Sequence, residues 1–337
     1  MTFGFNLIGR SLFLCLLSAA FIRTDSFALD RKSPCSAALS HYIMATVREN
    51  FGDMDNAVYE YKKALSADFE SSAIHLGLAS AYIKKNNIPQ AVGELNFAAT
   101  YDPQAVEPRA ILTLLYSVQN NPKMAAHQYE IALKNASILQ PKNVDIYKSQ
   151  GVIYLRQERW QEAESVYKTI LDISDQDSQA HFYLGGIYNK LKKSGLAEKE
   201  LKRALELKPD YHEALNFLGY LYVEENTNLL QAEAMIRKAL EMSPENGAYV
   251  DSLGWFYFKK GRYQEAIKML EKASLLADNP VIYDHLGDGY QKINDFQKAK
   301  INWEESLRLD PKQKRIRDKI EGLNKSLMIN AVHRYSN

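Results

Sequence analysis

A unit of about 34 residues recurs eight times along the chain, and no other feature of the sequence limits the possible folds as strongly. The copy "LGWFYFKKGRYQEAIKMLEKA" is matched one unit later by "LGDGYQKINDFQKAKINWEES". Successive anchor residues lie 34, 34, 38, 34, 34, 35 and 33 positions apart. The anchors are Ala45, Ala79, Thr113, Gly151, Gly185, Gly219, Gly254 and Gly287. Repeats of this length stack and bury a shared core, so each copy is expected to pack on its neighbours.

Comparison of the copies indicates that each unit is a pair of antiparallel helices. An alanine stands twelve or thirteen residues after every anchor, and small residues at both points let two helices approach closely. A tyrosine follows the anchor by three residues in seven copies, and its ring is expected to fill the space beside them. Glycine or asparagine, which tolerate a left-handed turn, separates the two helices at Gly52, Asn86, Asn120, Gly261 and Asn294. Proline ends the second helix at Pro103, Pro209, Pro244 and Pro311.

This spacing resembles the tetratricopeptide repeat, whose pattern is L-G-x-x-Y, then A, then an aromatic residue or Leu, then A, then P. In the seventh copy the matching residues are Leu253, Gly254, Tyr257, Ala266, Leu270 and Ala273. In the eighth they are Leu286, Gly287, Tyr290, Ala299, Trp303 and Pro311. The resemblance implies an all-α, right-handed superhelical solenoid that binds proteins or peptides on a concave side lined by the first helix of each pair.

The repeat also sets the expected organisation of the chain. We expect a polar-faced capping helix over 314–328, because the end of a solenoid needs a cover for its last apolar face. The third copy carries four extra residues and the sixth carries one extra residue in its turn. The expected repeats are 38–71, 72–105, 106–143, 144–177, 178–211, 212–246, 247–279 and 280–313.

Residues 1–28 have the composition of a secretory signal. Arg10 precedes the apolar run "SLFLCLLSAAFI", and Ser26 and Ala28 offer small residues two positions apart for a signal peptidase. We therefore expect an exported protein, periplasmic or in the cell envelope, with an uncleaved membrane anchor as the alternative. Cleavage would leave Cys35 as the one cysteine, which we expect to be a free thiol, although pairing with another chain stays open.

The charge balance argues against binding to nucleic acid. The chain has 42 basic and 41 acidic residues, and loss of 1–28 would leave no net charge. Membrane contact is expected only through an uncleaved N-terminus. The basic run "KQKRIRDK", which begins at Lys312 and ends at Lys319, is expected to be the solvated side of the capping helix.

Two kinds of column on the first helices predict where a ligand would bind. The column two residues after the anchor, from Val47 to Gly289, is apolar or glycine throughout and is predicted to be core. The column one residue after the anchor varies freely, and so do those three before and four after it, so these are expected to face the groove. In copies six to eight they predict ligand contacts at Asn216, Tyr220, Asp251, Trp255, Phe258, Asp284 and Asp288. Exposed aromatic residues with polar neighbours are typical of peptide-binding sites, and the aspartates would favour a partner with basic groups or free amides. Packing between repeats is the alternative role for the aromatic rings, and solvation is the alternative for the carboxylates.

No motif predicts catalysis, a metal or a cofactor. Histidines recur with the repeat period rather than with metal-ligand spacing, and no phosphate loop or nucleophile turn is present. Members of the resembled family that hold a C-terminal carboxylate use Lys and Asn on successive first helices. Lys148 matches one such position, but Val152 and Phe182 do not, so a carboxylate clamp is not expected.

The sequence as a whole predicts a non-enzymatic scaffold that binds protein or peptide partners as an adaptor or assembly factor. It resembles the envelope repeat proteins of bacteria in having both a signal and the repeats. Two alternatives stay open. One is a self-associating module whose groove is filled by its own termini or by another copy, and the other is a non-catalytic subunit of an envelope or glycosyl-transfer enzyme complex.

Overall fold

A computed structural model describes residues 36–335, with side chains as far as Ser326. The expected signal at 1–28 lies outside these residues. The chain divides into two compact units, the first ending at Asp175 (unit 1) and the second beginning at Gln176 (unit 2). All regular secondary structure between residues 36 and 335 is α-helical, as the repeat predicts. Within this range no helix has the length and apolar character needed to cross a membrane.

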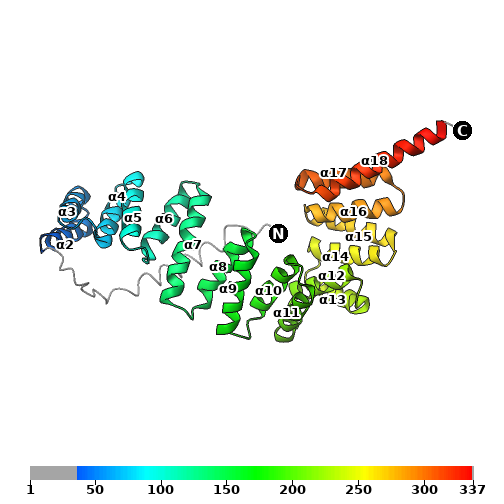
Figure 1. Cartoon of the computed structure of the whole chain (residues 1–337), viewed down its shortest axis with the longest axis horizontal. Helices are drawn as coiled ribbons and strands as arrows, with labels where there is room; N and C mark the ends of the chain where they lie inside the picture. Colours follow the sequence, from blue (N-terminus) through cyan, green and yellow to red (C-terminus); the bar gives the residue numbers. More distant parts are fainter. Residues whose placement is uncertain (1–35, 336–337) are drawn as a thin grey trace. The chain divides into compact units, whose positions relative to one another are not determined.

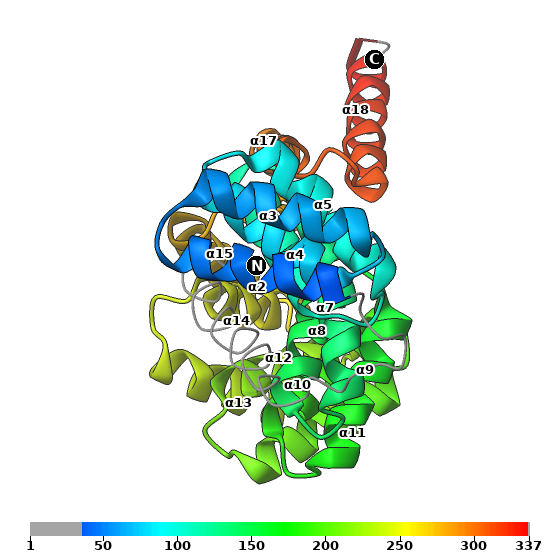
Figure 2. The same ribbon diagram turned by 90° about the vertical axis from the view of Figure 1, so that its left-hand side faces the viewer.

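Unit 1 consists of helices paired in chain order (Figure 1), and Figure 2 looks at it from the end where α2 and α3 lie in front. The two helices of each pair contact each other, and the second helix of a pair contacts the first helix of the next. The pairs are α2 (Ser36–Asn50) with α3 (Met54–Ala67), α4 (Ser72–Lys84) with α5 (Ile88–Tyr101), α6 (Glu107–Val118) with α7 (Pro122–Leu139), and α8 (Val144–Arg156) with α9 (Trp160–Ile173).

Unit 2 continues the same pattern and ends on a single helix. The pairs are α10 (Ser178–Lys190) with α11 (Ser194–Leu207), α12 (His212–Glu225) with α13 (Leu229–Met242), α14 (Gly247–Lys259) with α15 (Tyr263–Leu276), and α16 (Pro280–Lys292) with α17 (Phe296–Leu309). The last helix, α18 (Lys314–Tyr335), packs against α17. It begins where the sequence places the capping helix but runs past the predicted end at 328 (Figure 1). Its residues Ile316 and Leu323 are buried.

The close helix approach depends on the small anchor residues. A Cβ atom added at Gly254 would lie 2.8 Å from Cγ of Leu270, and one added at Gly287 would lie 2.4 Å from Cδ1 of Trp303. Each glycine anchor therefore makes room for one large side chain of the second helix. The predicted core column is confirmed in the later repeats but is wrong at Val47, which is 43% exposed. Val47 belongs to the first repeat, and no described repeat precedes it.

The turns inside the repeats have the left-handed conformation that the sequence predicts at glycine and asparagine. Gly52, Asn86, Asn120, Gly261 and Asn294 all have positive φ angles. Glu158 (φ 56°) and Lys192 (φ 60°) occupy the same position in their repeats, which residue type alone did not predict. The extra residue of the sixth repeat lies in a turn where both Asn226 and Asn228 are left-handed.

Replacing Lys192 by glycine is expected to raise the free energy of unfolding of unit 2 by about 1 kcal/mol, because a side chain with a Cβ is disfavoured at a positive φ. Lys192 is exposed, so the change removes no packing. Chemical denaturation would measure the effect. Lys199→Gly, at an exposed position inside α11, is the control and should lower stability by a similar amount. A loss of stability in both variants would contradict this explanation of the turn.

Candidate functional site

The seven predicted ligand contacts come from three first helices of unit 2 that lie next to one another. α12 contacts α14, and α14 contacts α16. α12 carries Asn216 and Tyr220, α14 carries Asp251, Trp255 and Phe258, and α16 carries Asp284 and Asp288. We call these seven residues the groove site; Asp251, Trp255 and Asp284 are buried, and the other four are partly buried.

An aromatic stack occupies the middle of the groove site. The Trp255 ring is parallel to Phe258, with ring centroids 4.5 Å apart, and to His285 on its other side at 3.9 Å. Its indole N–H donates a hydrogen bond to Glu224 at the end of α12. Trp255 is only 8% exposed, so the expectation that packing leaves this position free is wrong. The neighbouring ring of Phe258 is only partly buried and is the more accessible member of the stack.

The pair of Asp251 and His285 joins α14 to α16, and the His285 ring of this pair is the one that stacks on Trp255. Oδ1 of Asp251 lies 2.9 Å from Nδ1 of His285, and both residues are buried. Burial disfavours a charged imidazole, but the carboxylates of Asp251, Asp284 and Asp288 outweigh it and raise the pKa of His285. The sequence pattern does not predict His285 as a site residue, because its spacing from the other histidines gives no metal-ligand pattern.

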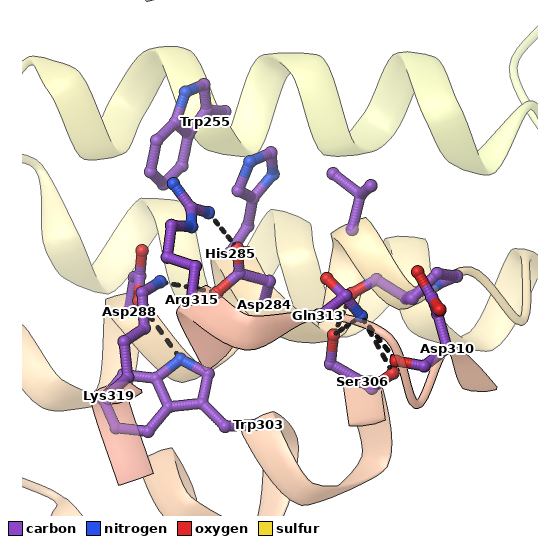
Figure 3. Close-up of polar contacts among 12 residues, drawn as sticks. Trp255, Asp284, His285, Asp288, Trp303, Ser306, Asp310, Gln313, Arg315 and Lys319 are labelled. Carbon is purple, nitrogen blue, oxygen red and sulfur yellow. Dashed lines mark hydrogen bonds and ion pairs between the residues drawn. The ribbon is translucent and has the colours of Figure 1, made fainter. Parts of the chain in front are cut away.

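The two aspartates of α16 are held by α18. Arg315 forms an ion pair with Asp284, and Lys319 contacts both Asp284, at 2.5 Å, and Asp288. Figure 3 shows both basic side chains pointing toward α16. Trp303 also donates its indole N–H to Asp288, at 3.1 Å.

These contacts correct two expectations. The basic run is not only the solvated side of the capping helix, since Lys319 faces the repeat while Lys312, Lys314 and Arg317 remain exposed. The aspartates at 251, 284 and 288 are all paired within the protein, so they give no reason to expect a basic partner. Burial raises the pKa of Asp288 even though the Lys319 ammonium acts in the opposite direction.

Two polar groups of α12 have no such partner. Oδ1 of Asn216 is buried without a hydrogen bond, and the Tyr220 hydroxyl has no hydrogen-bond partner among the described residues. Burial, together with the carboxylates of Glu224 and Asp251, raises the pKa of Tyr220, so its phenol keeps the proton and can donate it. Four residues separate Asn216 and Tyr220, which places them on the same side of α12. The Tyr220 hydroxyl can donate to a ligand, whereas Oδ1 of Asn216 is enclosed and would accept from a ligand only after its side chain turns outward.

The aromatic surface extends toward the first repeat of unit 2. Phe182 on α10 and Phe217 on α12 lie 6.2 Å apart in an edge-on arrangement. A Cβ added at Gly186 would meet the Phe217 ring at 3.5 Å, an ordinary contact distance, so this glycine does not reflect crowding. Phe182 and Gly186 stand in the columns that the sequence placed in the groove, although neither was among the predicted contacts.

The comparisons with known proteins concern the repeats themselves. Profiles described as tetratricopeptide repeat match residues 51–115, 114–178, 178–211 and 221–280, which together make up most of the chain. The chain belongs to the tetratricopeptide-repeat family. Proteins of this family are generally non-catalytic and bind protein or peptide partners.

Two curated relatives share part of this tetratricopeptide-repeat protein. The type IV pilus assembly protein PilF of Pseudomonas aeruginosa is 26% identical over 46% of the chain, which spans 61% of PilF. The anaphase-promoting complex subunit CDC16 of Saccharomyces cerevisiae is 24% identical over 56% of the chain, which spans 23% of CDC16. The chain therefore covers less than two thirds of either relative.

Solved structures share the fold of this tetratricopeptide-repeat protein at low sequence identity. A tetratricopeptide repeat protein from Parabacteroides merdae aligns with a TM-score of 0.57 and 17% identity, covering 75% of this chain and 98% of that one. The Cut9–Hcn1 hetero-tetramer of the APC/C aligns with a TM-score of 0.54 and 16% identity, covering 87% of this chain and 70% of that one. Both alignments agree with the all-helical repeat architecture.

Among the described residues no three histidine, cysteine, aspartate or glutamate side chains converge as metal ligands. Asp251 and His285 resemble two members of a hydrolytic triad, but the adjacent Ser252 donates its hydroxyl to the backbone oxygen of Ala248 at 2.9 Å. That hydroxyl is engaged by its own helix, so the pair is better explained as a buried link between two helices.

Proposed function

We propose that this protein is a non-enzymatic scaffold that binds a peptide or protein segment on the groove site of unit 2. The observation that carries the proposal is the contrast between α12 and the helices beside it. The carboxylates of Asp251, Asp284 and Asp288 are paired within the protein, whereas Asn216 and Tyr220 present polar groups without partners. A buried acceptor without a partner costs about 1–3 kcal/mol, which a ligand that donates a hydrogen bond would recover.

The free groups favour a neutral ligand with amide chemistry. A carbonyl oxygen can accept from the Tyr220 hydroxyl, and a peptide N–H or a side-chain amide can donate to Oδ1 of Asn216 once that side chain turns toward the ligand. The partly exposed ring of Phe258 supplies an apolar contact beside them. A strongly basic segment is not favoured, because Arg315 and Lys319 already neutralise Asp284 and Asp288.

We further propose that the protein is exported and serves assembly in the cell envelope. The support is the composition of residues 1–28 and the relative in P. aeruginosa, which is a type IV pilus assembly protein. Intact mass of the protein from its native host tests the first part. Cleavage after Ala28 is the expected result, and a full-length mass for the purified protein would contradict it.

Replacing Asn216 by leucine is expected to stabilise unit 2 by about 1 kcal/mol while weakening ligand binding, because the buried orphan acceptor is removed. Chemical denaturation measures the first effect. A fall in stability would show that Asn216 has a structural role that its contacts do not reveal.

The binding effect is measured by crosslinked pull-down from the native host, with the tagged full chain carrying Asn216→Leu and Tyr220→Phe. Partners recovered with the wild type are expected to fall about tenfold or more, since two hydrogen bonds are lost. Tyr59→Phe is the matched control, because Tyr59 is 55% exposed on α3, the second helix of its pair. Recovery of the same partners at undiminished yield by the folded double variant would refute the groove assignment.

A further inference from the structure

The first helix of unit 1 exposes a row of large apolar side chains. Leu39, Ile43, Met44 and Val47 are 44%, 54%, 47% and 43% exposed. Leu39, Ile43 and Val47 are four residues apart and Met44 is three residues before Val47, which places them on one side of α2. Phe51, in the turn that follows, is 85% exposed. In Figure 2, α2 is among the helices in front at this end of unit 1.

The positions of Met44 and Val47 are buried in later repeats, whereas that of Leu39 is mostly exposed and that of Ile43 is only partly buried in four of the seven. Met44 lies one residue before its anchor, and the leucines at this position are at most 4% exposed. These leucines are Leu78, Leu112, Leu184, Leu218, Leu253 and Leu286. Val47 belongs to a column that is buried in every later repeat. Around Met44 and Val47, α2 is therefore a repeat-packing surface with no described repeat against it.

The charged residues of α2 are turned away from this row. Arg48 pairs with Asp53 at 2.9 Å. Glu49 is buried and accepts hydrogen bonds from Tyr61 at 2.8 Å and Ser80 at 2.7 Å. Two titratable groups remain: His41 contacts Glu60 at 2.6 Å, and the ring of Tyr42 packs edge-on against Tyr61 with centroids 5.9 Å apart. Two copies of the apolar row could therefore face each other without like-charge repulsion.

The other end of the described chain is different. The exposed side of α18 carries Lys314, Arg317, Asp318, Glu321 and Lys325. Stacking the α2 end of one copy on the α18 end of another would bury these charges against an apolar row, which is costly. Pairing of α2 with α2 buries apolar groups on both sides.

We propose that the apolar row of α2 is the interface of a homodimer, in which the α2 helices of two copies pack against each other about a twofold axis. An isologous interface of this kind closes on itself and stops at two copies. It would give unit 1 the cover that the preceding repeat gives to each later one. The dimer leaves the groove site of unit 2 outside the interface residues, so its failure would not affect the proposed function.

The test is the mass of the full chain in solution over a wide concentration range, by light scattering or sedimentation. The wild type is expected to be a dimer. Ile43→Asp with Val47→Asp should weaken dimerisation about 100-fold or more and, at concentrations where both chains are monomeric, leave the unfolding temperature unchanged, because both residues are exposed. Ile301→Asp, at a 56% exposed position on α17, is the control and should remain dimeric.

A crosslink locates the interface directly. In a chain with Cys15→Ser and Cys35→Ser, Ile43→Cys is expected to form an intermolecular disulfide, because Ile43 lies midway along α2 and would fall near the twofold axis. A wild type that stays monomeric at high concentration overturns the proposal. If deletion of residues 1–35 then produces a dimer, the preceding segment of the same chain covers the row instead. A dimer that survives both aspartates also overturns it, because the interface must lie elsewhere.

Discussion

Replacing Trp303 by alanine is expected to lower the free energy of unfolding of unit 2 by about 3–5 kcal/mol. Trp303 is fully buried, and its ring lies where the missing side chain of Gly287 would be. Its indole N–H also donates to Asp288, which would lose that donor. Chemical denaturation monitored by circular dichroism would measure the change.

The control for Trp303 lies on the same helix. Ile301 is 56% exposed, so Ile301→Ala should change stability by less than about 1 kcal/mol. A similar small loss for Trp303→Ala would mean that the eighth repeat is not packed around this ring. Gly287→Ala tests the same contact from the other side, because its added Cβ would collide with the ring, and it should cost about 1–3 kcal/mol.

Replacing Asp251 by asparagine is expected to cost about 3 kcal/mol at mildly acidic pH, because it leaves the charged His285 without its buried partner. The folded protein raises the pKa of His285 above its unfolded value of about 6.5. The stabilising contribution of the pair is therefore complete below about pH 6.5 and is lost as the pH rises through the folded-state pKa.

The titratable groups near His285 come from several helices. They are the carboxylates of Asp251 on α14 and of Asp284 and Asp288 on α16, with the ring of Tyr220 on α12 also beside the imidazole; Arg315 and Lys319 on α18 contact Asp284. Stability measured against pH should fall with rising pH in the wild type, and Asp251→Asn or His285→Gln should remove most of that slope. A double-mutant cycle should give a large coupling energy between residues 251 and 285. Equal slopes in all variants would show that the pair does not titrate as proposed.

The helical repeat could be predicted from the sequence because the same residue types recur at the same positions in eight copies. Anchors, alanines and turn residues recur in register, so one exception does not hide the pattern. Val47 was predicted wrongly because its column is core only where a preceding repeat covers it. Glu158 and Lys192 adopt left-handed turns although their residue types do not favour that conformation, since the surrounding helix pair dictates the turn.

The groove site was harder to predict because its contacts cross between copies. Asp251 and Asp284 each stand three residues before an anchor, and each meets a basic residue of the next first helix. Those partners, His285 and Lys319, are 34 positions apart, which is one repeat length. The sequence therefore carries a signal for both pairs if α18 is counted as the first helix of a ninth repeat. The prediction that Trp255 is free of packing is wrong because a position whose residue type varies between repeats need not be exposed. Stacking on Phe258 and His285 buries this ring.

Site-specific photo-crosslinking tests the central claim most directly. A photoreactive phenylalanine derivative would replace Tyr220 or Phe258 in the full chain, and Tyr59 as the control, in cells of the native host. Crosslinks to the same partner protein are expected from positions 220 and 258 and not from position 59, because only the first two lie on the groove site. Partner crosslinks from position 59 alone, with none from 220 or 258 in folded protein, would contradict binding at this groove.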